Sequence, residues 1–213
     1  MAMTSSESDL KLSPEVIWYL ESRGIPLPDC PPRIKTPEPS DSEGAMFDPE
    51  RVARVLEAFG HLRHTQGQWA GNPLKPDPWQ VAYIIAPIFG WVRWDEDSVS
   101  YVRIIRNFYV DVPRKNGKST LIGGLAVYML AADHEPGAQI VTAATSERQA
   151  GFVFNPIKTL AEKSPALKKH VRTVSKKVIH PQSGSYIEVV SSVADAQHGA
   201  NIHFGCIDEL HVH

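Results

Sequence analysis

The chain has 213 residues, and its 22 Lys and Arg nearly balance its 24 Asp and Glu. The 42% hydrophobic content is ordinary for a globular protein, while near-neutral charge gives no overall sign of a nucleic-acid partner. Two cysteines are too few for a disulfide framework, and no apolar run approaches the roughly 18 residues that a membrane span needs. These features predict a soluble, cytoplasmic protein without a membrane partner.

The first 45 residues are expected to form an appendage of one helix and a proline-rich segment. Ser13 and Pro14 are a typical helix start, and Gly24 a typical end. Between Ile25 and Ser42 the prolines are too dense for a helix or a central strand. We therefore expect a linker, or a strap that lies on a surface.

Residues 46–213 are expected to form the main domain. Asp48 and the following proline predict a second helix start, and the apolar run 81–89 predicts a buried helix. Trp91 and Trp94, which follow this run, are interpreted as packing residues of the core or of a lid.

Strand and helix patterns alternate from residue 101 onward, which favours an α/β fold with a mostly parallel sheet covered on both faces. The second half of the pattern contains a predicted hairpin, with its turn at Pro181–Gly184. The expected elements are strands at 103–111 and 138–144, helices at 118–132 and 146–162, a hairpin within 172–192, and a last strand at 202–207.

The stretch from Arg114 to Thr120 lies between a predicted strand and a predicted helix. A Gly-Lys-Ser sequence at such a turn is typical of a phosphate-binding loop, where Lys118 reaches the outer phosphates and the Ser119 hydroxyl binds Mg²⁺. The usual pattern has glycine where this chain has Val112. A chance Gly-Lys-Ser is the alternative.

The predicted last strand runs directly into Asp208 and Glu209. This is the arrangement of a Walker B element, in which the first acid holds Mg²⁺ and the second activates the attacking water. The alternative is a solvated acidic turn. The phosphate-loop sequence within the same α/β pattern favours the catalytic interpretation.

Gln80 follows Pro78 and Trp79 at a predicted helix start. A glutamine amide can both donate to and accept from the edge of adenine. The alternative is a helix start with a buried tryptophan.

A basic run lies between Lys158 and Lys177, with seven Lys or Arg against one Glu. Such a run could follow the phosphates of DNA, or it could be a solvated helix face. Four histidines near the last strand have no metal-ligand spacing and are interpreted as packing or polar contacts: His198, His203, His211 and His213.

Four motifs, taken in order between residue 77 and residue 213, resemble the large terminase subunit of tailed bacteriophages. They are Pro78-Trp79-Gln80, then Val112-Pro113-Arg114-Lys115-Asn116-Gly117-Lys118-Ser119, then Ala143-Ala144-Thr145-Ser146-Glu147-Arg148-Gln149-Ala150, and finally His198-Gly199 with Cys206-Ile207-Asp208-Glu209-Leu210-His211.

This resemblance implies a three-layer P-loop ATPase of the additional-strand, catalytic-glutamate class, with a mostly parallel central sheet and an N-terminal helical appendage. In that family the domain uses ATP and Mg²⁺ to drive double-stranded DNA into an empty procapsid. The implied assembly is a homo-oligomeric ring, a pentamer, which docks on the portal protein at the procapsid vertex and works with a small terminase subunit in the host cytoplasm.

The resemblance also assigns residues. Arg114 matches the arginine of the family's deviant loop and is expected at the γ-phosphate, although a simple electrostatic role beside Lys115 is the alternative. The expected catalytic residues are Glu209, Arg114 and Lys118, and the expected Mg²⁺ ligands are Ser119 and Asp208. The expected ATP contacts are Gln80, Arg114, Lys115, Asn116, Gly117, Lys118, Ser119 and Thr120.

The family's coupling motif and nuclease domain are expected beyond His213. We therefore expect a fragment, or a split or interrupted gene product, and assign no nuclease activity to it. Two other functions stay open. One is a helicase or other nucleic-acid translocase with the same two motifs, and the other is a truncated product that binds nucleotide without turnover.

Overall fold

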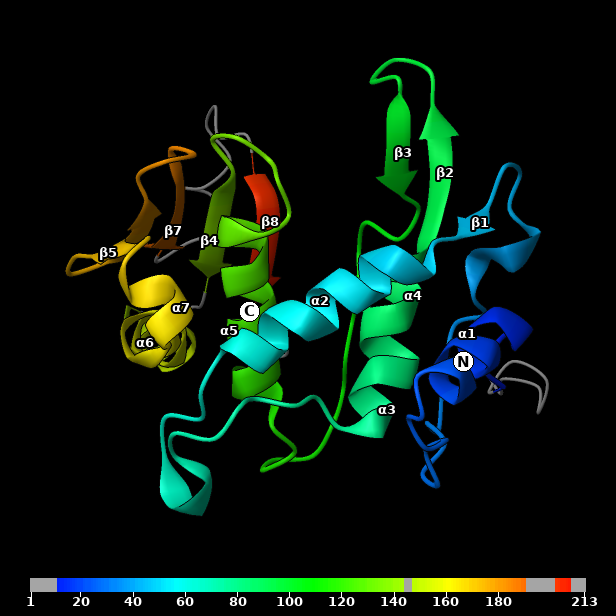
Figure 1. Ribbon diagram of the computed structural model, residues 1–213, viewed down its shortest axis with the longest axis horizontal. Helices are drawn as coiled ribbons and strands as arrows, with labels where there is room; N and C mark the ends of the chain where they lie inside the picture. Colours follow the sequence, from blue (N-terminus) through cyan, green and yellow to red (C-terminus); the bar gives the residue numbers. More distant parts are fainter. Residues whose placement is uncertain (1–10, 144–146, 191–201, 208–213) are drawn as a thin grey trace. The chain divides into compact units, whose positions relative to one another are not determined.

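The computed structural model of the protein describes residues 11–143, 147–190 and 202–207. The chain divides into two compact units (Figure 1). One comprises Met1–Leu56 with Pro76–Asp111, and the other comprises Glu57–Lys75 with Val112–His213. Helix α2 (Pro49–His61) carries the chain from the first unit into the second. Within the described residues, no helix combines the length and apolarity needed to cross a bilayer.

Helix α1 (Pro14–Ser22) begins where the sequence predicts it. The Ser13 hydroxyl accepts a hydrogen bond of 3.2 Å from the Val16 N–H, and Pro14 occupies the first turn. These two residues provide a side-chain cap and a preset backbone angle. The helix buries Val16, Tyr19 and Leu20 in the core of the first unit.

The proline-rich segment is fixed to the first unit by Glu38, just before the short helix η1 (Pro39–Asp41). The Glu38 carboxylate accepts hydrogen bonds from the Ser13 hydroxyl at 2.8 Å and from the Trp91 indole N–H at 2.9 Å. Lys35 lies 3.2 Å from the same carboxylate. The segment is therefore a strap on this unit, one of the two forms expected from the proline pattern.

The predicted helix at 81–89 is part of a longer helical run with a π-helical turn at its centre. The run consists of α3 (Pro78–Gln80), η3 (Val81–Ile85) and α4 (Ala86–Gly90). It leads into a small antiparallel sheet of order β1-β2-β3, formed by β1 (Met46–Phe47), β2 (Trp91–Asp95) and β3 (Ser100–Arg103). Trp91 is buried, whereas Trp94 is exposed. The Trp94 and Tyr101 rings meet edge-to-face, with their centroids 5.2 Å apart.

The prediction of a strand at 103–111 is wrong. Strand β3 ends at Arg103. One further backbone hydrogen bond, from the Ile104 N–H to the Trp91 carbonyl, follows its pairing with β2. Residues 105–113 are irregular, and the apolar side chains of Phe108, Tyr109 and Val110 are exposed. An apolar run predicts a strand only if a neighbouring strand is free to pair with it, and the run itself carries no information about that neighbour.

The second unit contains a five-stranded sheet of order β5-β6-β7-β4-β8. Its strands are β4 (Gln139–Ala143), β5 (Arg172–Thr173), β6 (Lys177–His180), β7 (Ser185–Val190) and β8 (Ile202–Ile207). The central strand β4 is parallel to β7 and β8, while β6 is antiparallel to β5 and β7. The described sheet is therefore mixed rather than mostly parallel, because the tight turns of the predicted hairpin region return the chain beside itself.

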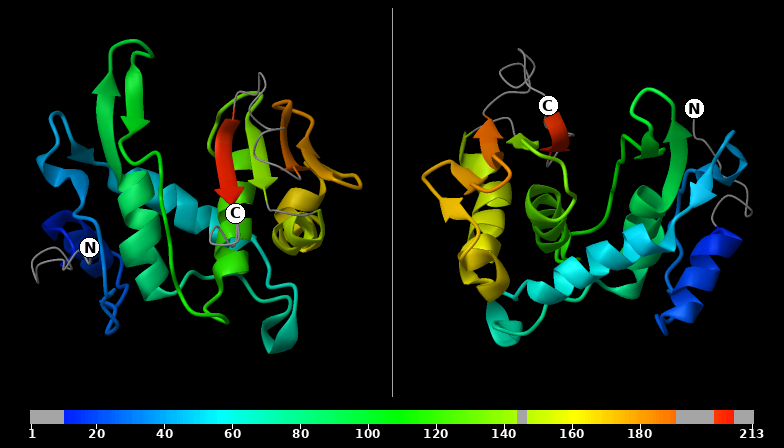
Figure 2. Two further views of the ribbon diagram at one scale, coloured as in Figure 1. Left: turned by 180° about the vertical axis from the view of Figure 1, so that it is seen from behind. Right: turned by 45° about the horizontal axis from the view of Figure 1, so that its top comes forward.

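Helices α5 (Lys118–Ala131) and α6 (Glu147–Lys163) confirm the two helices predicted in this unit. They lie side by side on one face of the sheet, and the short α7 (Pro165–Lys168) follows α6 (Figures 1 and 2). A Cβ on Gly123 would lie 2.9 Å from a Leu160 methyl group, and one on Gly124 would lie 2.4 Å from the Phe59 ring. The two glycines therefore allow α5 to pack closely against Leu160 of α6 and Phe59 of α2.

Candidate phosphate-binding site

The site is built on the turn that leads into α5. Gly117 is the N-cap of this helix, with φ +71° and ψ +12°, a left-handed conformation. Lys115 is also left-handed, with φ +71°, and the Asn116 side-chain amide donates a 3.2 Å hydrogen bond to the Pro113 carbonyl. A non-glycine residue in this region is uncommon and often marks a functional turn.

The N-terminus of α5 is not capped by a side chain. The first bond of the helix runs from the Leu121 N–H to the Gly117 carbonyl at 2.9 Å, so the three preceding N–H groups have no partner within the helix. Arg114, Lys115 and Ser119 are exposed around them, and Lys118 is partly exposed. Free N–H groups, the positive end of the helix dipole and three cations together suit an anion such as a phosphate chain.

The carboxyl ends of three parallel strands meet at one edge of the sheet. The register pairs Ala143 at the end of β4 with Val190 of β7 and with Ile207 of β8. Asp208 and Glu209 directly follow Ile207 but lie outside the described residues. Their predicted roles therefore stay predictions, and the described part contains no group of three His, Cys, Asp or Glu side chains that could hold a metal ion.

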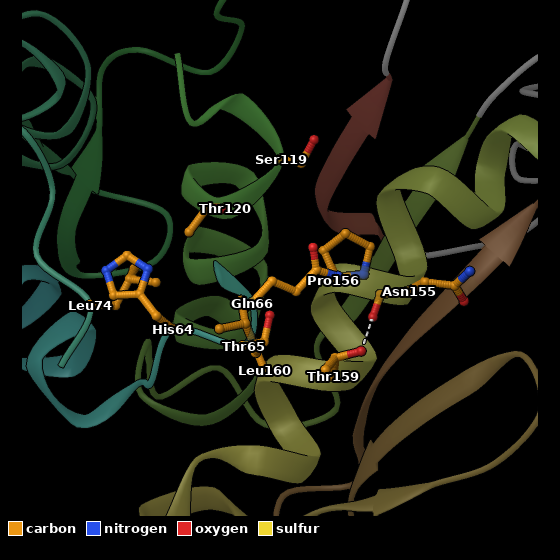
Figure 3. A pocket seen from close by; sticks show the side chains of 10 residues that line it. All are labelled: His64, Thr65, Gln66, Leu74, Ser119, Thr120, Asn155, Pro156, Thr159 and Leu160. Carbon is orange, nitrogen blue, oxygen red and sulfur yellow. Dashed lines mark hydrogen bonds between the residues drawn. The ribbon is translucent and has the colours of Figure 1, made fainter. Parts of the chain in front are cut away.

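A pocket adjoins the first turn of α5 (Figure 3). Ser119 and Thr120 contribute to its wall, and the rest comes from α6 and from the loop around η2 (Gly67–Trp69). Its volume is about 340 Å³, and its lining mixes polar with apolar side chains: His64, Thr65, Gln66, Leu74, Asn155, Pro156, Thr159 and Leu160. The pocket-lining role of the 64–74 loop was not predicted, because nothing in its sequence indicates that it lies beside α5.

Two hydrogen bonds help hold this loop in the second unit. The Arg63 N–H donates a 3.1 Å hydrogen bond to the hydroxyl of the buried Ser164, and the Leu74 N–H donates a 3.0 Å hydrogen bond to the Leu62 carbonyl. The first bond joins the start of the loop to the residue that follows α6, and the second joins the end of the loop to the chain just before it.

Gln80 belongs to the first unit, where its side chain is 6% exposed. Its amide oxygen accepts a 3.0 Å hydrogen bond from the Asp77 N–H, and the Asp77 side chain completes a capping box at the start of α3. Gln80 thus has a structural role at a helix start. Its predicted contact with adenine stays a prediction.

His203 is the one described member of the predicted histidine group. Its Nε2 lies 2.6 Å from an Asp133 carboxylate oxygen, which joins the first part of β8 to the residue following α5 and its C-cap. The predicted polar contact is confirmed for this residue. It lies at the opposite end of α5 from the phosphate loop.

Comparison with known proteins places this site within a known domain. The family model described as terminase large subunit, ATPase domain, matches residues 78–213. The large terminase subunit of Enterobacteria phage HK97 is 28% identical over 163 residues, which are 75% of this chain and 30% of that protein. The crystal structure of the HK97 bacteriophage large terminase is similar with a TM-score of 0.56 at 23% identity, over 74% of this chain and 30% of that one. The structural likeness shows a shared mixed α/β fold, and this chain spans about 30% of the length of these relatives.

Proposed function

The chain belongs to the family of terminase large subunits, over their ATPase domain, and from this premise we propose that it hydrolyses ATP to drive double-stranded DNA into a viral procapsid. The observation that carries the proposal is the uncapped N-terminus of α5, with Lys118 and Ser119 in its first turn, inside the region that matches the family. An open helix N-terminus beside cations supports binding of the ATP phosphates.

The proposed fold subclass is a three-layer P-loop ATPase of the additional-strand, catalytic-glutamate class. Support comes from the three adjacent parallel strands β7, β4 and β8, with β4 between the other two, and from α5 packed against all three. In this class Lys118 neutralises charge on the outer phosphates, and Arg114 neutralises charge that develops on the γ-phosphate. The exposure of Arg114 leaves its guanidinium accessible to a bound nucleotide.

Mg²⁺ fits the donors that the chain offers, since hydroxyl and carboxylate oxygens are its preferred ligands. Ser119 has an exposed side chain at the open end of α5, and Asp208 follows the end of β8. When bound, the ion neutralises charge on the β- and γ-phosphates. We propose Ser119 and Asp208 as the residues that hold it.

Glu209 is the proposed general base. Its carboxylate takes a proton from water while the water oxygen forms a bond to the γ-phosphorus, and the bond between that phosphorus and the bridging oxygen of ADP breaks. Gln80 is proposed to recognise adenine through its side-chain amide. The proposed partners are duplex DNA, the portal protein, a small terminase subunit and further copies of the chain in a pentameric ring, in the host cytoplasm and at the portal vertex.

Separate measurements of MgATP binding and phosphate release on the 213-residue chain test this proposal. Lys118→Ala should weaken MgATP binding by about tenfold or more, because it removes a direct phosphate contact. Glu209→Gln should leave binding nearly unchanged and lower turnover by about 100-fold or more, because it removes only the general base. Lys75→Gln, which removes an exposed cation outside the proposed site, is the control.

Normal turnover in both site variants would overturn the proposal. Wild-type binding without any turnover would favour a nucleotide-binding product, and separation of the strands of a tailed duplex would favour a helicase.

A further inference from the structure

Four exposed cations lie along one edge of the second unit, on the last residue of α6, on and just after α7, and on β5. We call this surface the cationic edge and define it as Lys163, Lys168, Lys169 and Arg172. β5 is one edge strand of the described sheet and β8 is the other. Arg172 therefore lies on the edge strand opposite β8, the strand that leads to Asp208 and Glu209.

The backbone that carries the cationic edge is well ordered by hydrogen bonds. The Ser164 carbonyl accepts from the Leu167 and Lys168 N–H groups at 2.9 and 3.0 Å, and the Leu167 carbonyl accepts from the His170 N–H at 2.7 Å. The Thr173 hydroxyl donates 2.6 Å to Glu162, which joins β5 to α6. The cations thus come from a fixed scaffold, and little backbone ordering is needed when they bind a ligand.

The cationic edge lacks acidic partners. In the described residues, none of its four members has an ion pair, whereas two neighbouring lysines do. Lys158 lies 4.0 Å from Glu162, and Lys177 lies 2.8 Å from Glu188. The hydrogen bond to Glu188 raises the pKa of Lys177 above its ordinary value. Lys158 and Lys177, at the two ends of the basic run, therefore have acidic partners, whereas the four members of the cationic edge have none among the described residues.

We infer that the cationic edge binds the phosphate backbone of duplex DNA. Several exposed cations without acidic partners among the described residues suit the negative phosphate backbone, and such contacts carry no base-sequence information. A membrane surface fits less well, because Val174 is the one large apolar side chain exposed within residues 163–174. The inference rests on the proposed function for its choice of DNA, and it adds a contact surface apart from the nucleotide site.

The test compares two quadruple variants that lose the same charge. One changes Lys163, Lys168, Lys169 and Arg172 to Gln, and the control changes four exposed cations elsewhere, Lys11, Arg33, Arg54 and Lys75, to Gln. Binding of the 213-residue chain to a mixed-sequence duplex of about 30 base pairs is measured across salt concentrations. Log affinity falls as log salt rises, and each lost phosphate contact reduces the steepness of this fall by about 1. In the edge variant the magnitude of this slope should be smaller by up to about 4, and the control should keep the wild-type slope.

Equal slopes for the two variants would overturn the inference. Equal competition by polyglutamate at matched charge, or equal binding to vesicles of anionic lipid, would also overturn it by pointing to another polyanion. ATP turnover without DNA should be unchanged in the edge variant. A failure of the proposed ATPase would instead appear as unchanged turnover in Lys118→Ala, so the two results are distinguishable.

Discussion

At the scale of single residues, the phosphate loop depends on backbone angles that few residues adopt. Gly117 adopts its left-handed angles without a Cβ clash, whereas Lys115 adopts similar angles with a full side chain. The sequence predicted the helix that begins at Lys118, because Gly-Lys-Ser before an apolar run is a local signal, and the phosphate-binding role of the turn stays a prediction. The left-handed Lys115 could not be predicted, since lysine gives no indication of such a conformation.

Gly117→Ala should cost about 1 kcal/mol of unfolding free energy and weaken MgATP binding by about tenfold, because the added methyl strains the turn and hinders close approach of a phosphate. The matched control is Gly184→Ala in the hairpin turn, where φ is +72° and nothing lies within 4 Å of an added Cβ. It should lose similar stability and keep wild-type affinity for MgATP. Equal affinity losses in both variants would contradict a specific role for Gly117. Urea denaturation and titration calorimetry measure the two effects.

At the scale of elements, local signals predicted helices well. Ser13 with Pro14 and Asp48 with Pro49 mark helix starts by chemistry that acts within a few residues, and both helices begin there. The prediction of a strand at 103–111 was wrong, because strand formation depends on a pairing strand elsewhere in the chain. The pair Asp133–His203 was equally beyond sequence reasoning, since 70 residues separate its members.

This pair is expected to stabilise β8 against α5. Asp133→Asn should lower the unfolding free energy by about 1–3 kcal/mol, because the side chains are mostly buried and the 2.6 Å contact loses its carboxylate. Glu50→Gln breaks the exposed pair of Glu50 with Arg23, at 3.2 Å, and should cost less than about 1 kcal/mol. Equal effects of the two changes in urea denaturation would contradict the assigned role of Asp133.

At the scale of the whole molecule, the alternating pattern predicted an α/β fold, and the mixed sheet packed against α5 and α6 agrees with that class. The predicted cover of both faces stays a prediction, because α5 and α6 lie on the same face of the described sheet. The strand order was not predictable, because it is set by contacts between distant segments. The division also differs from a simple N-terminal appendage, since Pro76–Asp111 joins the first unit and Glu57–Lys75 joins the second. The chain passes into the second unit at residue 57, returns to the first at residue 76 and enters the second again at residue 112. No change in composition marks these crossings.

We propose that the chain is the ATP-hydrolysing part of a DNA-packaging motor. The most direct test is the steady-state rate of phosphate release from MgATP by the 213-residue chain, with and without duplex DNA, for wild type and for Lys118→Ala. The wild type should show measurable turnover that increases with duplex DNA, and the variant should lose about 100-fold or more of this turnover. Turnover in Lys118→Ala equal to that of the wild type would contradict the proposal.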